Sequence, residues 1–373
     1  MSPDPSRAEV VVDLRAVRHN LSLLAGRAAA SGAATMAVVK ADGYGHGALP
    51  VAKAALEAGA TWLGACSADE ALALRDAGIT ARLFSWLDLP DVDFAPAIAA
   101  DVDLSVSSGE ELARVAAAAH RTGQRARVHL KIDTGLSRNG CPASAWPALV
   151  KAAGAEPDVE VVAVWSHLAC ADEPGHPSID MQARRFHAAY EIAREAGLNP
   201  LRHIANSAAT LTRPDLHFEL VRPGIAMYGL NPVPQREDLR PAMTFRSSVV
   251  LTKRIEAGES VSYGHTWTAP RDTTLALVPT GYADGVPRTL SGRMDVWLHG
   301  KRRPVAGRVC MDQLVVDCGD DEPPLGAEVI LFGDGARGEP TAREWAETIG
   351  TIDYEIVTGM YRPRVRRRYV GEA

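Results

Sequence analysis

Short apolar runs that end in small or polar residues recur between Thr35 and Ile225, and most are followed by a stretch with helical periodicity. Eight of these runs are typical of strands: residues 35–40, 62–67, 82–87, 103–108, 127–133, 161–168, 201–207 and 220–225. Near-continuous apolar runs of this length favour strands covered on both faces, as in a parallel sheet. Eight strands alternating with helices predict a (β/α)8 barrel, with a doubly wound open sheet as the alternative.

Helix signals occupy the segments between these runs. S-x-x-E capping boxes at Ser67/Glu70 and Ser108/Glu111 come directly after two predicted strands, where a helix should begin. An earlier helix is predicted from residue 13 to about residue 32, with leucine and valine on one face.

The pattern changes after the proline-rich segment 231–241. Alternating or β-branched runs follow at residues 244–255, 274–279, 294–300, 313–319 and 327–333. A single helix is predicted over 341–349, opened by a capping box at Thr341/Glu344. We therefore expect two domains, a barrel over 1–235 and a mostly β domain over 236–373.

Composition narrows the class of protein. The chain has 373 residues, of which 46% are apolar, enough to bury one or two substantial cores. It carries 40 Lys and Arg against 46 Asp and Glu, and its one basic run, 362–368, is predicted to be a solvated strand or tail without a function. Nucleic acid is therefore not an expected partner.

Cysteine usage and the N-terminal segment bear on the compartment. The five cysteines are odd in number and scattered, which argues against a disulfide framework and against a zinc site. Residues 1–17 lack the features of a signal peptide, and no apolar run approaches the roughly 18 residues that span a bilayer. We expect a soluble cytoplasmic protein in a reducing compartment, with no membrane partner and no metal.

In a barrel, catalytic groups belong at the C-terminal ends of the strands. That rule selects Lys40, the segment 131–138, His167, Ser207 and the segment 222–225. A lysine inside a barrel mouth is costly to keep charged, so burial lowers its pKa toward an amine that can form a Schiff base or move protons. From position alone, an ion-paired or snorkelling lysine remains the alternative.

The segment AVVKADGYGHG (37–47) resembles the pyridoxal-phosphate lysine motif of alanine racemases. Eight further segments resemble that family in the same order: HLKIDTGLSRNG (129–140), WSHLACADEP (165–174), HIANSAAT (203–210), VRPGIAMYG (221–229), SYGHTW (262–267), GYADG (281–285), GRVCMDQ (307–313) and IDYEIV (352–357). The resemblance implies a fold-type III enzyme, with an N-terminal barrel and a C-terminal β domain. It also implies a pyridoxal 5'-phosphate-dependent racemase that interconverts L- and D-alanine and supplies D-alanine for peptidoglycan.

Racemisation takes a proton from one face of Cα and returns it on the other, so two bases are needed. The resemblance assigns these roles to Lys40, which would also hold the cofactor covalently, and to Tyr263. It further implies a head-to-tail homodimer, in which Tyr263, Tyr282 and Met311 of one subunit reach the barrel of the other, Met311 near the substrate carboxylate and Tyr282 at the entrance. Taken alone, Tyr263 and Met311 are more typical of core packing.

The resemblance assigns Arg222 to the pyridine nitrogen of the cofactor. A guanidinium only donates hydrogen bonds, so that nitrogen must stay unprotonated, which weakens the ring as an electron sink and suits simple proton removal and return. His167 would connect Arg222 toward Tyr263 and help lower the phenol pKa. A buried core histidine is the alternative for His167.

The phosphate of the cofactor would be held by Tyr44, Ser207, the backbone amides of Gly224 and Ile225, and Tyr354. Hydroxyl and amide donors can converge on an anion at such a place. Without the resemblance, Ser207 is as typical of a helix N-cap as of a ligand.

Arg138 would bind the substrate carboxylate, because two of its N–H groups can bond in parallel. Lys131 lies close to it along the chain, and family members often carry a carbamylated lysine at this position. A buried lysine beside an arginine should have a lowered pKa, and the neutral amine is the form that reacts with carbon dioxide. We expect carbamylation of Lys131, and we expect Asp133 and Asn206 to act as structural supports.

Other functions share some of these features. A related fold-type III racemase for serine, or one of broad specificity, would keep the barrel, the lysine and the tyrosine. A fold-type III decarboxylase matches the 262–267 and 307–313 segments less well. A non-catalytic pyridoxal-phosphate carrier would lack the β domain, and a metabolite-binding barrel would form no covalent link to a cofactor.

Overall fold

The computed structural model describes residues 7–372, which divide into two compact units. The larger unit comprises Ala16–Gly43 and Ala48–Leu239. The smaller unit comprises the described residues up to Arg15, the segment Tyr44–Gly47 and the chain from Arg240 onward. Within residues 7–372, no helix combines the length and the apolar character that a membrane crossing requires.

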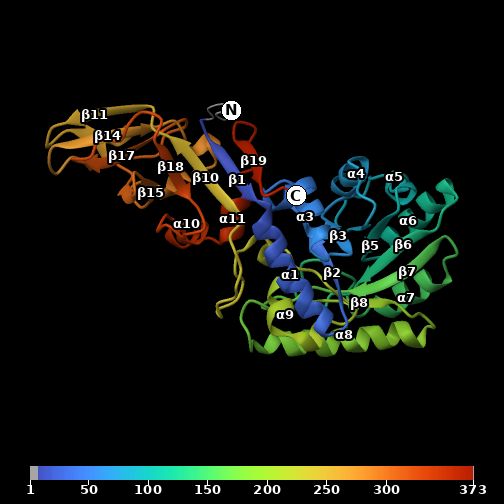
Figure 1. The fold of residues 1–373 in the computed structure, drawn as a ribbon. Helices are drawn as coiled ribbons and strands as arrows, with labels where there is room; N and C mark the ends of the chain where they lie inside the picture. Colours follow the sequence, from blue (N-terminus) through green and yellow to red (C-terminus); the bar gives the residue numbers. More distant parts are fainter. Residues whose placement is uncertain (1–6, 373) are drawn as a thin grey trace. The chain divides into compact units, whose positions relative to one another are not determined.

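Eight parallel strands form a nearly closed barrel in the larger unit (Figure 1). They are β2 (Ala34–Val38), β3 (Trp62–Ala65), β4 (Arg82–Ser85), β5 (Val102–Val106), β6 (Ala126–Lys131), β7 (Val159–Trp165), β8 (Leu201–His203) and β9 (Leu220–Val221). Their order is β8-β7-β6-β5-β4-β3-β2-β9, and the N–H of Arg222 donates to the carbonyl of Ala205 across the gap between the two end strands. The predicted (β/α)8 barrel is confirmed, and each of the eight predicted runs contains a strand or overlaps one.

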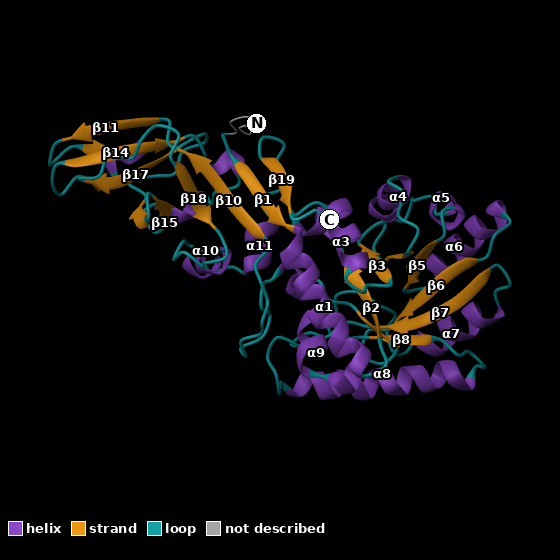
Figure 2. Ribbon diagram, in the orientation of Figure 1, coloured by secondary structure: helices purple, strands orange, loops and turns teal. Residues whose placement is uncertain are grey.

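Helices alternate with the strands around the barrel (Figure 2). They are α1 (Leu14–Ala30), α3 (Ala48–Glu57), α4 (Ala68–Asp76), α5 (Ala95–Ala99), α6 (Gly109–Thr122), α7 (Trp146–Ala155), α8 (Pro177–Glu195) and α9 (Ser207–Thr212). Apolar side chains from five strands pack together in one cluster: Met36, Trp62, Phe84, Trp165 and Leu220. This buried cluster joins strands of the barrel, among them β2, β7 and β9, after which predicted site residues follow.

The S-x-x-E motifs form only half of each predicted capping box in the barrel. The hydroxyls of Ser67 and Ser108 accept hydrogen bonds from the backbone N–H groups of Glu70 and Glu111, as an N-cap requires. The glutamate carboxylates, however, accept from the residue before each cap, at Cys66 and Ser107. Each glutamate therefore fastens its helix to the end of the preceding strand rather than to the cap itself.

The smaller unit is mostly β and contains three sheets. Its strands are β1 (Glu9–Asp13), β10 (Met243–Ser248), β11 (Leu251–Ile255), β12 (Ser260–Val261), β13 (Trp267–Thr268), β14 (Thr273–Val278), β15 (Asp295–Leu298), β16 (Lys301–Pro304), β17 (Leu314–Gly319), β18 (Glu328–Phe332) and β19 (Arg366–Val370). The six-stranded sheet has the order β16-β15-β18-β10-β1-β19, and β11-β14-β17 form a second sheet beside the β12-β13 ribbon. The prediction of a mostly β region after the barrel is confirmed.

Strand β1 was not foreseen from the sequence. It pairs antiparallel with β10, Val10 opposite Phe245, and parallel with β19, so it lies inside the six-stranded sheet. The Glu9 carboxylate pairs with the Arg246 guanidinium at 2.6 Å across this ladder. The basic run 362–368 contributes its last three residues to β19, in agreement with the predicted strand.

Two helices, not the single predicted one, pack in this unit. The helix α10 (Ala342–Ile349) begins at a complete capping box, in which the Thr341 hydroxyl and the Glu344 carboxylate each accept the other residue's backbone N–H. The second helix, α11 (Asp353–Thr358), carries Tyr354. It is too short to show a clear apolar period in the sequence.

Candidate functional site

Lys40 lies two residues beyond the end of β2, at the C-terminal end of the barrel. The turn that follows has left-handed backbone at Ala41 (φ 51°), Asp42 (φ 50°) and Gly43 (φ 62°). The Asp42 carboxylate accepts the N–H of Ala48 at 2.8 Å and so closes the turn onto α3. Burial lowers the pKa of Lys40, as the sequence argument expects for an amine that forms a Schiff base or moves protons.

The Glu70 carboxylate fixes the peptide next to Lys40. Its Oε1 accepts the N–H of Ala41 at 2.8 Å, and its Oε2 accepts the N–H of Cys66 at 2.7 Å. One carboxylate thus links the turn after β2 to the end of β3. Glu70 itself lies in the first turn of helix α4. Charge-assisted bonds of this kind are among the stronger hydrogen bonds in proteins.

Arg222 follows β9 and is buried, with 5% of its surface exposed. Its Nη1 donates to Nδ1 of His203 at 2.9 Å, and its Nη2 donates to the carbonyl of Ser166 at 2.8 Å. Longer bonds from Nη2 reach Nδ1 of His167 at 3.3 Å and the Ile204 carbonyl at 3.4 Å. Within residues 7–372 the Nε–H has no acceptor, so it remains for a ligand nitrogen that can accept a hydrogen bond.

His167 lies two residues beyond β7 and contacts Arg222 through its Nδ1. Because the guanidinium can only donate, Nδ1 is the acceptor and the imidazole proton is on Nε2. Burial lowers the pKa of His167 well below its usual value, and the charges of Arg222 and Arg138 lower it further. His167 is therefore a neutral imidazole whose one N–H, at Nε2, points away from the Arg222 contact.

Ser207 is the first residue of α9, but it does not cap that helix. The cap is Asn206, whose side-chain oxygen accepts the N–H of Ala209 at 3.1 Å. The Ser207 hydroxyl instead accepts the N–H of Gly224 at 2.8 Å and the N–H of Ala226 at 3.2 Å. Since its oxygen already accepts two bonds, the hydroxyl proton can be donated outward, to an anion placed at this convergence of donors.

Lys131 ends β6 and is buried, with its ammonium nitrogen 4.1 Å from the centroid of the Trp165 ring. Burial lowers its pKa to about 7, and the positive charges of Arg222 and Arg138 act in the same direction. Arg138 itself is exposed. Its loop is shaped by the Asp133 carboxylate, which accepts the N–H groups of Gly135 and Ser137.

Two predicted phosphate ligands come together in the smaller unit. The rings of Tyr44 and Tyr354 lie with their centroids 6.3 Å apart, although the two residues come from opposite ends of the chain. Gly45 follows in this segment with φ 80°, and a Cβ there would lie 2.4 Å from the carbonyl oxygen of Val357 on α11. The close approach of the two segments therefore depends on glycine at position 45.

Tyr282 and Met311 are joined through the backbone of their segments. The N–H of Tyr282 donates to the Cys310 carbonyl, and the N–H of Ala283 donates to the Met311 carbonyl. A Cβ at Gly281 would lie 2.2 Å from the Cys310 oxygen, so this contact requires glycine.

Tyr263 comes from a third segment, which contacts the chain next to Met311. The hydroxyl of Ser262, beside it, donates to the Arg308 carbonyl and contacts the Cys310 sulfur at 3.4 Å. The side chains of Tyr263, Tyr282 and Met311 are exposed by 73%, 38% and 52%. Three large side chains that packing would otherwise bury are thus presented to the exterior of this unit.

Four residues of consequence were not assigned a role from the sequence: His203, His129 and Asp103 inside the barrel, and Glu70 as a support for Lys40. The three barrel residues have one sequence signal, a polar residue inside an apolar strand, as with Asp103 in DLSV and His129 in VHLK. The sequence does not show which groups such a residue contacts, because its partners come from other strands of the barrel.

Two family models match most of the chain. The family model described as "Alanine racemase, N-terminal domain" matches residues 12–232, and "Alanine racemase, C-terminal domain" matches residues 242–369. An alanine racemase of Frankia casuarinae is 56% identical, with 98% of this chain and 96% of the relative covered. One of Salinispora arenicola is 55% identical, with 98% and 99% covered.

Solved structures agree with these relatives. The alanine racemase from D-cycloserine-producing Streptomyces lavendulae superposes with a TM-score of 0.96 at 51% identity, covering 99% of this chain and 98% of that one. The alanine racemase of Streptomyces coelicolor gives a TM-score of 0.94 at 52% identity, covering 98% of each chain. By sequence over almost its whole length and by fold, the chain belongs to the alanine racemase family.

Proposed function

We propose that this chain interconverts L- and D-alanine in a pyridoxal 5'-phosphate-dependent reaction, and that it supplies D-alanine for peptidoglycan. The relatives named alanine racemase, matched along almost the entire chain, are the observation that carries this proposal. In the proposed division of labour the barrel, predicted over 1–235, holds the cofactor, and the β domain, predicted over 236–373, completes the site. The described residues up to Arg15 and the segment Tyr44–Gly47 belong to the β unit, which resumes at Arg240.

The residues of the barrel fit the cofactor. Lys40 has the lowered pKa that covalent attachment of an aldehyde requires, and Arg222 has an Nε–H left for a pyridine nitrogen. The Ser207 hydroxyl proton and the Ile225 backbone N–H are donors suited to a phosphate, and the Gly224 N–H, which donates to the Ser207 oxygen here, lies beside them. The Tyr44 and Tyr354 hydroxyls would complete the phosphate ligands. When bound, pyridoxal phosphate supplies a conjugated ring that acidifies the Cα proton of an attached amino acid.

The protein's own groups then move the proton. With the cofactor bound, the Lys40 amine would take or return the proton on one face of Cα, and the Tyr263 phenol would do so on the other face. Arg222 can only donate, so it would hold the pyridine nitrogen of the cofactor in its unprotonated form, and this would favour brief proton transfer over side reactions. His167, neutral and bonded to Arg222, has its Nε2–H to offer toward Tyr263.

The substrate carboxylate would be bound by Arg138, with a carbamylated Lys131 supplying the negative charge that steadies this arginine. Met311 and Tyr282 would line the same pocket near the carboxylate and at the entrance. We propose a homodimer in which the latter two residues and Tyr263 come from the second copy of the chain. Their exposure together on the β unit, on segments joined by hydrogen bonds, supports a partner surface.

The test uses the purified protein in heavy water. We expect visible absorption from lysine-bound cofactor and, on addition of L-alanine, deuterated D-alanine without keto acid, measured by chiral chromatography and mass spectrometry. Cofactor absorption without isotope exchange on alanine would contradict the proposed reaction. Exchange on serine but not on alanine would identify a serine racemase of the same fold.

A further inference from the structure

Arg222 is a buried cation that forms no ion pair with a carboxylate within residues 7–372. Its side-chain hydrogen-bond acceptors are two imidazole nitrogens and two backbone carbonyls, all of them neutral groups. Burying an unpaired guanidinium is costly. We therefore expect a compensating negative charge elsewhere in the barrel, connected to Arg222 through other groups.

A continuous hydrogen-bonded chain leads from Arg222 to a carboxylate. Nη1 of Arg222 lies 2.9 Å from Nδ1 of His203, and Nε2 of His203 lies 2.8 Å from Nδ1 of His129. Nε2 of His129 lies 3.2 Å from Oδ2 of Asp103. We call these four residues the Arg222–Asp103 chain.

The two ends of the Arg222–Asp103 chain fix every proton in it. Arg222 can only donate, so Nδ1 of His203 accepts and its proton is on Nε2. That proton is donated to Nδ1 of His129, whose own proton is then on Nε2 and is donated to Asp103. An ionised carboxylate can only accept, so the far end is consistent with this single direction. Both imidazoles are neutral Nε2–H tautomers.

The ionisation states agree with this assignment. Burial lowers the pKa of both His203 and His129, which keeps the two imidazoles neutral. Burial alone would raise the pKa of Asp103, but the hydrogen bond from His129 and the charges of Arg82 and Arg127 outweigh it and lower that pKa. The carboxylate is therefore ionised.

Packing holds the two imidazole planes. The His129 ring stacks on Phe84 with centroids 4.1 Å apart and an interplanar angle of 17°, and the His203 ring stacks on Trp165 at 5.5 Å and 14°. The side chains of His129, His203 and Asp103 are fully buried. Because neither ring can rotate without leaving its stack, the chain is a rigid element of the barrel core.

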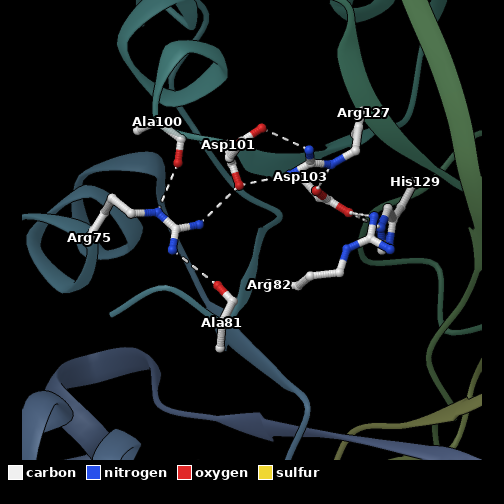
Figure 3. A network of polar contacts seen from close by, with 8 residues as sticks. All are labelled: Arg75, Ala81, Arg82, Ala100, Asp101, Asp103, Arg127 and His129. Atoms are coloured by element: carbon white, nitrogen blue, oxygen red, sulfur yellow. Dashed lines mark hydrogen bonds and ion pairs between the residues drawn. The ribbon is translucent and has the colours of Figure 1, made fainter. Parts of the chain in front are cut away.

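The carboxylate end is anchored near the N-terminal ends of the strands. Figure 3 shows Asp103, near the start of β5, beside Arg82 and Arg127. Its Oδ1 accepts from Nε of Arg127, and its Oδ2 accepts from Nη2 of Arg82 at 3.0 Å. Arg127 also pairs with Asp101 at 2.8 Å, so Asp101 shares the cluster without touching the chain.

We propose that Asp103 and His129 are positioning residues for Arg222, which they orient and electrostatically support through His203 from the opposite end of the barrel. The carboxylate polarises each imidazole in turn, so that Nδ1 of His203 becomes a stronger acceptor for Nη1 of Arg222. This keeps the guanidinium plane fixed with its Nε–H directed away from the chain. The inference rests on the proposed function, in which that N–H meets the cofactor.

The test compares Asp103→Asn with Asp101→Asn, two matched charge removals beside Arg127. We expect Asp103→Asn to lower kcat for alanine by about tenfold or more, with KM nearly unchanged, because the misplaced group acts on the cofactor ring and not on substrate binding. Asp101→Asn should stay within about twofold of the parent, as a surface charge away from the chain. Equal kcat values for the two variants would overturn the proposal.

A second variant tests the chain while keeping the Asp103 carboxylate, in case Asp103→Asn disturbs the fold. His129→Phe keeps an aromatic ring against Phe84 and leaves Asp103 paired with its arginines, but it interrupts the chain. We expect a kcat loss of similar size, about tenfold, at a temperature where the variant is folded. The unfolding midpoint in urea should fall, because the buried His203 Nε2–H loses its acceptor. An active His129→Phe enzyme with the parent kcat would contradict the proposal.

A spectroscopic readout separates this inference from the proposed reaction. In protein labelled with ¹⁵N-histidine, we expect His203 and His129 as neutral Nε2–H tautomers over pH 6–9, and Asp103→Asn should shift the Nδ1 resonance of His203 while Asp101→Asn does not. An Nδ1–H tautomer for either residue, or an unshifted resonance, would overturn the chain. A protein that shows these resonances but does not racemise alanine would refute the proposed reaction alone.

Discussion

The Glu70 carboxylate accepts the backbone N–H of Ala41 at 2.8 Å, directly beside Lys40, and with its other oxygen it holds the end of the neighbouring strand. The left-handed turn after Lys40 is strained for Ala41 and Asp42, because L residues with a Cβ seldom adopt positive φ. A carboxylate with both oxygens engaged is therefore part of what keeps Lys40 in place.

Glu70→Gln should test this support. A glutamine can accept only one of the two N–H groups and turns its own NH2 toward the other, so we expect a loss of about 1–3 kcal/mol in unfolding free energy. We also expect a fall in kcat as Lys40 loses its fixed position. Asp69→Asn is the matched control, because the exposed Asp69 carboxylate lies in the same helical turn. Urea titration and initial rates would show the difference, and identical behaviour of the two variants would refute it.

Ser207→Ala should weaken cofactor binding. The change leaves the Gly224 and Ala226 amides without their hydroxyl acceptor and removes one donor to the phosphate, so we expect a Kd for pyridoxal phosphate raised about tenfold or more. Thr212→Val is the control, since that hydroxyl bonds within α9, to Ala208. Titration of cofactor-stripped protein gives both values. An unchanged Kd for Ser207→Ala would remove this residue from the phosphate site.

The fold was predictable because its signals are local. Most barrel strands and the helices after them are marked by apolar period and cap within one short stretch of sequence, as at Ser108 and α6. Strand β1 was not, because its partners come from distant parts of the chain, at Met243–Ser248 and Arg366–Val370. A short apolar run before a helix carries no sign of such a pairing.

The site residues likewise divide into those that local sequence predicts and those whose contacts depend on the folded barrel. Lys40 and Ser207 follow from their positions at strand ends together with the family resemblance. The role of Ser207 as an acceptor, with Asn206 as the cap, depends instead on the turn at Gly224. The Arg222–Asp103 chain joins residues from four different strands or strand ends through the barrel interior. Only a closed barrel brings His129 and His203 within hydrogen-bond distance.

Lys131 should be carbamylated in a pH-dependent manner. Its pKa of about 7 makes the neutral, reactive amine the major form at pH 8 and a minor form at pH 6. We expect a ¹³C carbamate resonance from labelled bicarbonate at pH 8 that is lost toward pH 6. Lys131→Ala should lack it at both values. A parent enzyme that is active at pH 8 without this resonance would contradict carbamylation.

The same pKa has a consequence for stability in buffer free of carbon dioxide. The folded pKa of Lys131 lies below its ordinary value of 10.5, so between pH 7 and 10.5 the unfolded chain binds more protons than the folded one. Unfolding free energy should therefore rise with pH across this window, by up to about 1.4 kcal/mol per pH unit from this group. Lys131→Met should flatten the rise in urea titrations made at several pH values, and an unchanged slope would contradict the shift.

Lys40→Ala and Tyr263→Ala test the shared site. Each change alone should abolish racemisation, because each removes the base on one face of Cα. The milder change Tyr263→Phe should slow isotope exchange from L-alanine far more than it weakens cofactor binding. Rates of Cα isotope exchange and cofactor titrations give the two quantities. Parent-like exchange in Tyr263→Phe would end the assignment of two bases.

If Tyr263 of one copy serves Lys40 of the other, a mixed dimer of Lys40→Ala and Tyr263→Ala subunits has one site with both defects and one with neither. We expect mixing of the two inactive proteins to restore activity, up to about a quarter of the parent value when subunits exchange at random, since half the dimers are mixed and each has one of two sites intact. Exchange is verified by native mass spectrometry of differently tagged subunits. Confirmed exchange without recovery would place both bases in one subunit and would contradict the shared site.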